Sequence, residues 1–463
     1  MTKRVPDVFV IVFSLVLLAA VATWVLPGGH YERRKEQVGD SVREVAVPGS
    51  FQVQPSRPQT VQVFTAPIKG FLRLGDIIAF IFLVGGSFYI LNETGAIAAG
   101  IRQLVVKLKG REYLVIPIVM TFFSFFGAVF GMCEEAMPFV LIFVPLALAL
   151  GYDSIVGVCL SFLAAGVGFA GAFINPFTLQ IAQGLAGIPL LSGMAYRVVI
   201  WVVVTALVIA WVMVYAARVK ADPRRSPMYE LDEARRQELS RAQEAHASFS
   251  WRDGACLGIL FLGVAGMIVG VVRFHWYIVE LAGLFFAMGV LAGAAAGMSP
   301  DRIARAFVAG CKDIAGAALI VGFAGGILVI LENGNVMDTL LHAMASVTGK
   351  LPGVLAAHAM YLVQMGVNFF IPSGSTKAAL TMPLMAPLAD LSGITRQTAV
   401  LAYQFGDGFT NMIIPTSGVT VGTLAMAKIP FERWARWHWP MQLAFFLASL
   451  LFLAYAALTG WQG

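Results

Sequence analysis

Two polar clusters lie inside segments that are otherwise apolar enough for a lipid bilayer. In "FFGAVFGMCEEAMPF", Glu134 and Glu135 are adjacent carboxylates. In "NFFIPSGSTKAALTM", the polar cluster is Ser373–Lys377. The residues up to it, Leu351–Thr376, include no Asp, Glu, Lys or Arg, and Lys377 is the first charged residue after them. Adjacent carboxylates at membrane depth repel and require a proton or a cation, whereas hydroxyl and ammonium groups suit a carboxylate. The two clusters predict binding of a small charged solute or an ion.

Each cluster also has a purely structural interpretation. Glu134 and Glu135 would both be solvated if their loop reached the cytoplasmic interface; otherwise they bind sodium, take up a proton or receive a substrate ammonium. A Ser/Thr/Gly cluster can serve tight helix packing, but this leaves Lys377 unexplained, because its insertion near the bilayer centre costs about 2.5–3.5 kcal/mol. Asp407, with Asn411 one turn on, is a further buried acid, whose structural alternative is a salt bridge to Lys377.

Two proline-containing interruptions follow the clusters, "FINPFTLQ" at 173–180 and "IIPTSGVT" at 413–420. Proline removes a backbone donor and breaks an intramembrane helix, so freed backbone groups point into the gap. Half-helix N-termini favour anions and C-terminal ends favour cations. Side-chain oxygens at these breaks come from Asn175, Thr178, Thr416 and Ser417. One such break is most often a packing kink, but a matched pair favours a binding site.

Composition identifies the class of protein. Of 463 residues, 59% are hydrophobic and 13% are charged, against about 25% charged in soluble domains. Uncharged runs of spanning length predict membrane helices at Val8–Leu26, Tyr113–Cys133, Val198–Ala217, Gly254–Val272, Leu281–Pro300 and Pro440–Gly463. These runs are apolar all round, which excludes the alternating pattern of a membrane β-barrel. The chain is therefore expected to be an all-α integral membrane protein, without a nucleic-acid partner, whose net charge of +6 lies beside its helices.

An internal repeat relates the two halves at a displacement of about 240 residues. The matched landmarks are Gly70 with Gly310, Gly85–Gly86 with Gly325–Gly326, Ile90–Leu91 with Ile330–Leu331, and Gly168–Phe169 with Gly408–Phe409. Basic residues at Lys3, Arg4, Arg102–Arg111 and Arg218–Trp251 place these segments in the cytoplasm. Equivalent helices then run in opposite directions, which is the inverted repeat of many secondary transporters.

The expected architecture has about nine spanning helices and two re-entrant hairpins, with the N-terminus inside and the C-terminus outside. The first repeat is 1–217, with a hairpin near 114–151 and a broken helix near 154–190; the linker is 218–252; the remainder is 253–463, with a hairpin near 352–391 and a broken helix near 397–427. The hairpins and broken helices would carry the solute, and the other helices would form a scaffold and a homodimer interface.

Long motifs carry a family resemblance. "GMCEEAMPF", "GFAGAFINPFTLQIAQGLAGIPLLSG", "NFFIPSGSTKAALTMPLMAPLADLSGITRQTAVLAYQFGDGFTN" and "IIPTSGVTVGTLA" resemble the YfcC-type branch of the C4-dicarboxylate anaerobic carrier (DcuC-like) family, over nearly the whole chain. The resemblance implies an ion-transporter fold with two hairpins, two broken helices and an elevator-type movement. It implies a shared site made of Glu134, Glu135, Asn175, Thr178, Ser373, Gly374, Ser375, Thr376, Lys377, Asp407, Asn411, Thr416 and Ser417.

Two departures from the family pattern affect the substrate. Dicarboxylate carriers among the wider relatives have Ser-Asn-Thr at both tips, whereas one tip here reads "MCEEA", which is a poor host for a dianion without cations. Thr376-Lys377 replaces the small neutral pair usual in the branch. Some relatives are labelled basic amino-acid exchangers, which suits a carboxylate pair.

The expected function is secondary active transport of a small carboxylate-bearing solute, a C4-dicarboxylate, an amino acid or a small peptide, across a bacterial inner membrane. Sodium, near Glu134, Glu135, Asn175 and Asp407, or protons are the expected coupling ions. A channel would need a ring of like groups. An enzyme is not expected, because neither HExxH nor GxSxG occurs. A non-transporting membrane sensor is the remaining alternative.

Overall fold

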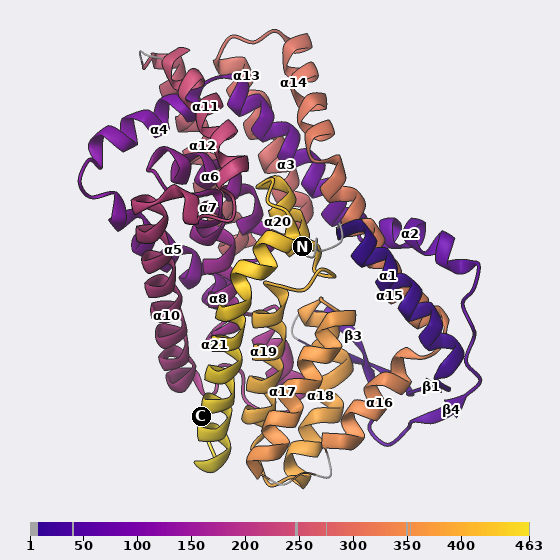
Figure 1. The fold of residues 1–463 in the computed structure, drawn as a ribbon. Coiled ribbons are helices and arrows are strands. Elements are labelled where there is room, and N and C mark those ends of the chain that lie inside the picture. The colour runs from indigo at the N-terminus through magenta and orange to yellow at the C-terminus, as the bar shows by residue number, and fades with distance from the viewer. Residues whose placement is uncertain are drawn as a thin grey trace.

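The computed structural model describes residues 8–38, 41–245, 249–274, 276–348, 351 and 353–462, and this part of the chain is nearly all helical (Figure 1). Within it, 7 helices are long and apolar enough to cross a membrane, or up to 8 if one bent pair, Pro300–Asp313 with Ala318–Asn333, counts as a single span. The expected class, a helical membrane protein, is confirmed, while the count of nine spans stays a prediction.

The helices of the first half precede the polar segment of the linker. Their bounds are α1 Val8–Val25, α2 Gln62–Arg73, α3 Gly75–Glu93, α4 Ala96–Lys107, α5 Val115–Phe130, α6 Val140–Ala149, α7 Ser154–Val158, α8 Ala164–Ala170, α9 Leu179–Leu185 and α10 Met194–Ala221. The linker helix is α11 Tyr229–Ala245. The second half follows as α12 Trp251–Phe274, α13 Ile278–Ala295, α14 Pro300–Asp313, α15 Ala315–Asn333, α16 Met337–Thr348, α17 Gly353–Phe370, α18 Gly374–Leu391, α19 Arg396–Asn411, α20 Gly418–Met426 and α21 Phe431–Leu458.

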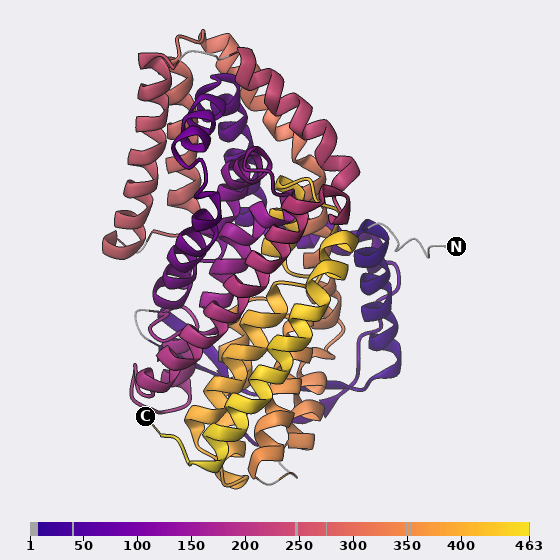
Figure 2. The same cartoon turned by 60° about the vertical axis from the view of Figure 1, so that its left-hand side comes forward.

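The same helix pairings occur in both halves. α2 packs against α15 as α14 packs against α3, and α1 packs against α15 as α13 packs against α3. Small residues allow two of these crossings, because a Cβ on Gly70 would lie 2.2 Å from the Gly322 carbonyl oxygen and one on Gly310 would lie 2.6 Å from the Gly85 carbonyl oxygen. The last long helices of the halves, α10 and α21, contact each other (Figure 2).

Each half also holds two apolar arms joined by a polar tip. α5 ends at Phe130 and is followed by Gly131, whose φ of +69° is open to glycine at little cost, and a 3₁₀ helix, Glu134–Phe139, leads into α6. In the second half, α17 ends at Phe370 and α18 begins at Gly374. α5 packs against α8, and α17 packs against α19.

The helices that follow the tips are interrupted where the prolines predict. α7, a π-helical turn at Cys159–Leu163 and α8 run to Ala170, and α9 resumes only at Leu179. α19 ends at Asn411, and α20 resumes at Gly418. Pro176 and Pro415 lie in the two gaps, so backbone groups that a continuous helix would pair are available to other partners.

Four short strands depart from the all-α expectation. β1 (Gly28–His30) pairs antiparallel with β4 (Gln52–Gln54), and β2 (Arg33–Val38) pairs antiparallel with β3 (Ser41–Ala46). They depend on tertiary partners: Asp338 of α16 accepts the Tyr31 N–H at 2.9 Å and contacts Arg33 at 2.8 Å. Burial and the neighbouring Asp338 charge raise the pKa of Tyr31 to about 12, so its hydroxyl stays protonated beside His342 Nδ1 at 2.9 Å. β3 in turn contacts α18.

A buried carboxylate ties the first broken helix to the linker. Asp153 is fully buried; it accepts hydrogen bonds from the Val156 N–H at 3.0 Å, the Ser226 hydroxyl at 2.6 Å and the Tyr215 hydroxyl at 2.5 Å. It thereby caps α7 and joins this helix to α10 and the residues before α11. Asp232 of α11 accepts the Ser154 N–H at 2.8 Å, so two carboxylates hold the same helix start.

We expect Asp153→Ala to destabilise the fold by about 2 kcal/mol or more, because it removes a helix cap and leaves buried hydroxyl donors without an acceptor. The measurement is the apparent melting temperature of the purified protein in detergent. Asp222→Ala is the matched control, because Asp222 caps only the short exposed turn Pro223–Arg225 and should change the melting temperature little. Equal melting temperatures for the two variants would contradict the anchoring role.

Candidate functional site

Both tips lie against the first break. A Cβ on Gly131, at the first tip, would lie 2.5 Å from Asn175 Oδ1 at the first break. A Cβ on Gly374, at the second tip, would lie 2.5 Å from Thr178 Cγ2 and 3.0 Å from Asp407 Oδ2. The second tip therefore contacts the break of the first half as well as the helix of its own half, and only glycine fits at that junction.

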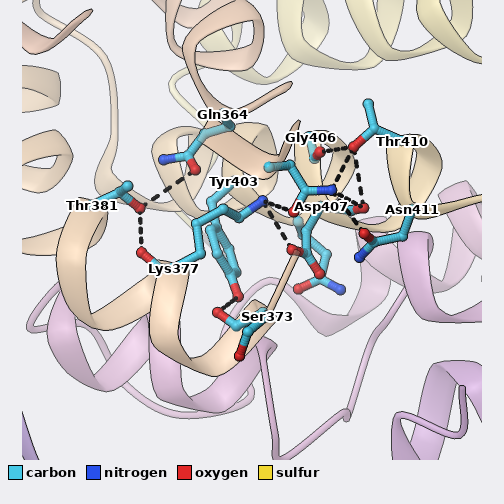
Figure 3. A network of polar contacts seen from close by, with 12 residues as sticks. Gln364, Ser373, Lys377, Thr381, Tyr403, Gly406, Asp407, Thr410 and Asn411 are labelled. Atoms are coloured by element: carbon cyan, nitrogen blue, oxygen red, sulfur yellow. Dashed lines mark hydrogen bonds and ion pairs between the residues drawn. The ribbon is translucent and has the colours of Figure 1, made fainter. Parts of the chain in front are cut away.

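A buried ion pair joins the second hairpin to α19 (Figure 3). Lys377 Nζ lies 2.9 Å from Asp407 Oδ1, and neither side chain has any solvent exposure. The same ammonium donates to Asn368 Oδ1 at 3.2 Å. Breaking such a pair costs about 3–5 kcal/mol, because one charge is left buried without compensation. The salt bridge that the sequence offered as a structural interpretation is thus present.

Aromatic and amide groups complete this network. The Tyr403 hydroxyl donates to the Gly374 carbonyl oxygen at 2.7 Å, and its ring centroid is 5.0 Å from Lys377 Nζ, within the range of a cation–π contact. Asn368 Nδ2 donates to the Thr410 hydroxyl oxygen at 2.7 Å and to Asn411 Oδ1 at 3.0 Å. The amide of Asn368 therefore links the ammonium to the C-terminal turn of α19.

The first tip is acidic and partly open. Glu134 is half-buried, whereas Glu135 is 5% exposed and accepts the Cys133 N–H at 3.1 Å. The charges of Glu135 and Asp407 both act on Glu134. The Tyr277 hydroxyl, at the start of α13, is within reach of the Glu134 charge.

The side chain of Asn175 pairs backbone N–H groups of the first break, and two buried side-chain atoms of this break have no hydrogen-bond partner among the described residues. Asn175 Oδ1 accepts the N–H groups of Phe177 at 2.9 Å and Thr178 at 3.2 Å, while the Asn175 N–H donates to the Ala128 carbonyl oxygen on α5 at 3.2 Å. Asn175 Nδ2 and Thr178 Oγ1 are buried and have no hydrogen-bond partner among the described residues. Buried polar atoms are nearly always paired, so these two are available to a ligand or water.

The second break also contains a buried polar atom without a hydrogen-bond partner among the described residues. Ser417 caps α20 by accepting the Thr420 N–H at 3.4 Å, whereas Thr416 Oγ1 is buried and finds no hydrogen-bond partner within the described ranges. On α19, just before this break, Asp407 Oδ2 also has no hydrogen-bond donor among the described residues. Asp407 Oδ1 forms the ion contact with Lys377 Nζ, without an aligned hydrogen bond.

The second tip is the more accessible of the two. Ser373 is exposed, and Gly374, Ser375 and Thr376 are half-buried. The Ser373 hydroxyl donates to Thr376 Oγ1 at 3.0 Å rather than capping the backbone of α18. The first N–H groups of α18 therefore lack a side-chain cap at a helix end, a position that favours anions.

The sequence-derived residues fall into two groups. Contacts join Asn175, Thr178, Gly374, Lys377, Asp407 and Asn411 into one cluster. The tip that carries Glu134 and Glu135 adjoins this cluster at Gly131, where an added Cβ would lie 2.5 Å from Asn175 Oδ1. Thr416 and Ser417 lie at the second break, and Ser373, Ser375 and Thr376 line the second tip. Among the described residues, none of these five forms a hydrogen bond or an ion pair with the acidic tip. Their binding roles stay predictions.

Sequence reasoning missed four residues of the network: Gln364, Asn368, Tyr403 and Thr410. Asn368 and Gln364 are spaced i, i+4 on α17, and Tyr403, Asp407 and Thr410 are spaced i, i+4, i+7 on α19. Such spacing places polar groups on one face of a helix. The signal in the sequence was a row of polar residues on one face of α17, which is otherwise apolar, and a second row on one face of α19 around Asp407.

Comparison with known proteins identifies the family. The family model described as "C4-dicarboxylate anaerobic carrier" (DcuC) matches residues 5–458. The chain belongs to the C4-dicarboxylate anaerobic carrier family. It is 38% identical to a protein of Escherichia coli (strain K12) named "Putative basic amino acid antiporter YfcC", with 100% of this chain and 98% of that protein covered. An uncharacterized protein of Haemophilus influenzae is 32% identical, with 95% and 94% covered.

Members of this family are transporters rather than enzymes, so the chain is a multi-pass membrane protein of a transporter family. Among solved structures, the Alcanivorax borkumensis YdaH transporter aligns over 99% of both chains at 17% identity with a TM-score of 0.44. MtrF of Neisseria gonorrhoeae aligns over 98% of this chain and 96% of its own at 15% identity with a TM-score of 0.43.

We expect Gly374→Ala to disturb the junction of the second tip, because the added methyl group would lie 2.5 Å from Thr178 Cγ2. Overpacking of this kind typically costs about 1–3 kcal/mol and here displaces the tip from Asp407. The measurements are the melting temperature in detergent and solute uptake in vesicles. Gly258→Ala on α12, where no atom lies within 4 Å of the added Cβ, is the control and should leave both unchanged. Normal uptake by Gly374→Ala would show that the junction plays no part in transport.

Proposed function

We propose that the protein is a secondary active transporter that exchanges small amino acids carrying a second amino group. The supporting observation is the charge of the site. The tips, the breaks and the last two turns of α19 together contain four charged side chains, Glu134, Glu135, Lys377 and Asp407. Lys377 neutralises Asp407, which leaves two carboxylates at the first tip. Two negative charges at membrane depth favour a cationic solute, with a proton or a sodium ion supplying the remaining charge.

Both ends of such a solute have complementary groups. The ammonium groups would face Glu134 and Glu135, and the α-carboxylate would face the uncapped N–H groups and hydroxyls at Ser373–Thr376. Asn175 Nδ2 and the hydroxyl groups of Thr178 and Thr416, which lack partners among the described residues, would hydrogen-bond the solute or ordered water. The name of the 38% identical relative supports the same class of substrate.

A C4-dicarboxylate is the second candidate, because the family model carries that name. A dianion would require both acidic side chains at the first tip to be neutralised, by protons or by sodium ions, before it could bind. Symport of a dicarboxylate with cations is therefore the alternative to exchange of cationic amino acids.

The proposed architecture is an inverted repeat with nine spans, two re-entrant hairpins and an elevator movement. The moving module would consist of α5–α9 and α17–α20; the remaining helices would form the scaffold and a homodimer interface. The repeated helix pairings support the inverted repeat. A cavity of about 350 Å³ between α3, α4 and α14 on one side and α6 and α20 on the other, bordered by α11, gives the module room at this boundary. We place the protein in the bacterial inner membrane, with the N-terminus inside and the C-terminus outside.

The carboxylates at the first tip can be tested by counterflow in proteoliposomes. In vesicles loaded with unlabelled ornithine, we expect exchange of labelled arginine to fall at least about tenfold in Glu134→Gln and in Glu135→Gln, because loss of one charge-assisted hydrogen bond costs about 1.5–3 kcal/mol. Glu230→Gln, at an exposed side chain of α11, is the control. Unchanged exchange in both tip variants rejects their role, and counterflow driven only by dicarboxylates selects the second candidate.

The elevator movement can be tested by a cross-link between α20 and α15. A Cβ on Gly418 would lie 3.3 Å from Val321 Cγ1, so cysteines at both positions fit a disulfide. In a background without the four native cysteines, we expect oxidation of Gly418→Cys/Val321→Cys to stop transport and reduction to restore it. Gly100→Cys/Leu257→Cys, which joins the scaffold helices α4 and α12, is the control. Full transport by the oxidised α20–α15 pair would exclude relative movement there.

A further inference from the structure

The ammonium of Lys377 lies between two side-chain oxygens and an aromatic face. Its nearest groups are Asp407 Oδ1 at 2.9 Å and Asn368 Oδ1 at 3.2 Å, with the face of Tyr403 at 5.0 Å. A carboxylate and an amide carbonyl are hard oxygen ligands, and an aromatic face also attracts cations. Without Lys377, this pocket would hold an uncompensated buried carboxylate.

The pocket lies between parts that must come together for binding. Lys377 is on the first turn of α18 beside the second tip, and Asp407 is on α19 just before the second break. The remaining oxygen, Asp407 Oδ2, faces Gly374 and, through it, Thr178 of the first break. A cation at this position therefore holds together the elements of the candidate site.

The feature belongs to one half only. At the displacement of about 240 residues that relates the halves, the positions of Asn368, Lys377 and Asp407 are taken by Ala128, Met137 and Val167. The first half has its charges one turn away, at Glu134 and Glu135. One half thus carries a cation of its own, and the other presents carboxylates to an external cation.

We propose that Lys377 is a tethered cation that replaces a free alkali ion beside Asp407, so that the second hairpin does not bind sodium. This inference rests on the proposed function and deepens it: exchange of cationic solutes at Glu134 and Glu135 then requires no sodium at the Asp407 pocket. Lys377 and Asp407 move together, and the pocket keeps the same charge with and without solute. An ammonium fixed to the chain cannot dissociate, so this pocket holds one cation throughout the transport cycle.

The test replaces Lys377 and asks whether sodium takes its place. Purified protein is melted in sodium chloride and in choline chloride at equal ionic strength, with no solute present. Wild type should show no sodium-specific rise in melting temperature that depends on Asp407. Lys377→Ala, which opens space next to Asp407, should melt lower in choline and recover by about 5 °C in saturating sodium. Lys377→Met, which fills the space with an uncharged chain, and Lys377→Ala/Asp407→Asn should show no sodium effect.

Two outcomes overturn the proposal. One is a sodium-specific rise in the melting temperature of wild type that Asp407→Asn abolishes, because sodium would then bind beside the lysine. The other is a Lys377→Ala variant that folds and is indifferent to sodium, because the ion pair would then be structural only. If that variant does not fold, the comparison of wild type with Asp407→Asn decides. Equal melting temperatures of wild type in sodium and choline, or a sodium effect that Asp407→Asn leaves unchanged, support the proposal, and a sodium effect that Asp407→Asn abolishes rejects it. Absence of counterflow for every solute contradicts the transport function instead, and the melting data remain valid.

Discussion

The contact between Lys377 and Asp407 is the interaction on which the arrangement of the candidate site depends. Both side chains have no solvent exposure, so neither water nor counter-ions from solution compensate their charges. Each charge is tolerable only because the other is present, so α18 and α19 must stay in register at this level. Asn368 and Tyr403 then take their positions from the ion pair, and the glycine at 374 allows the first break to approach the same place.

The second constraint is the pairing of backbone groups at the breaks. Irregular backbone at membrane depth persists only where protein or water satisfies it. At the first break, the Ala128 carbonyl and the side chain of Asn175 take up the freed N–H groups. At the second break, Ser417 restarts the helix. Among the described residues, polar side-chain atoms of Asn175, Thr178 and Thr416 remain without a hydrogen-bond partner at these two breaks. The breaks in the helices therefore also supply hydrogen-bonding groups that a ligand or water can use.

Much of this could be read from the sequence, because charges and prolines inside long apolar runs stand out against their surroundings. The tips at Glu134 and Ser373 and both breaks were identified in this way. Of the partners of Lys377, the sequence indicated Asp407 but not Asn368 and Tyr403. These two can be identified only when it is known which faces of α17 and α19 meet. The strands β1–β4 were missed for a related reason: they are held by Asp338, about 300 residues further along the chain. Asp153 resembles an ordinary loop residue until Tyr215 and Ser226 are placed beside it.

The glycine crossings of the scaffold have a mechanical consequence. Where a backbone carbonyl at Gly322 meets Gly70, and one at Gly85 meets Gly310, the main chains touch without intervening side chains. Surfaces in such direct contact resist sliding, because any shift drives rigid peptide planes into one another. In the elevator movement that we propose, α2 with α15 and α3 with α14 would therefore move as fixed pairs, and displacement would occur at the side-chain contacts that α15 and α3 make with α20. The close backbone contacts of these helix pairs would thus determine which helix contacts change during the proposed movement.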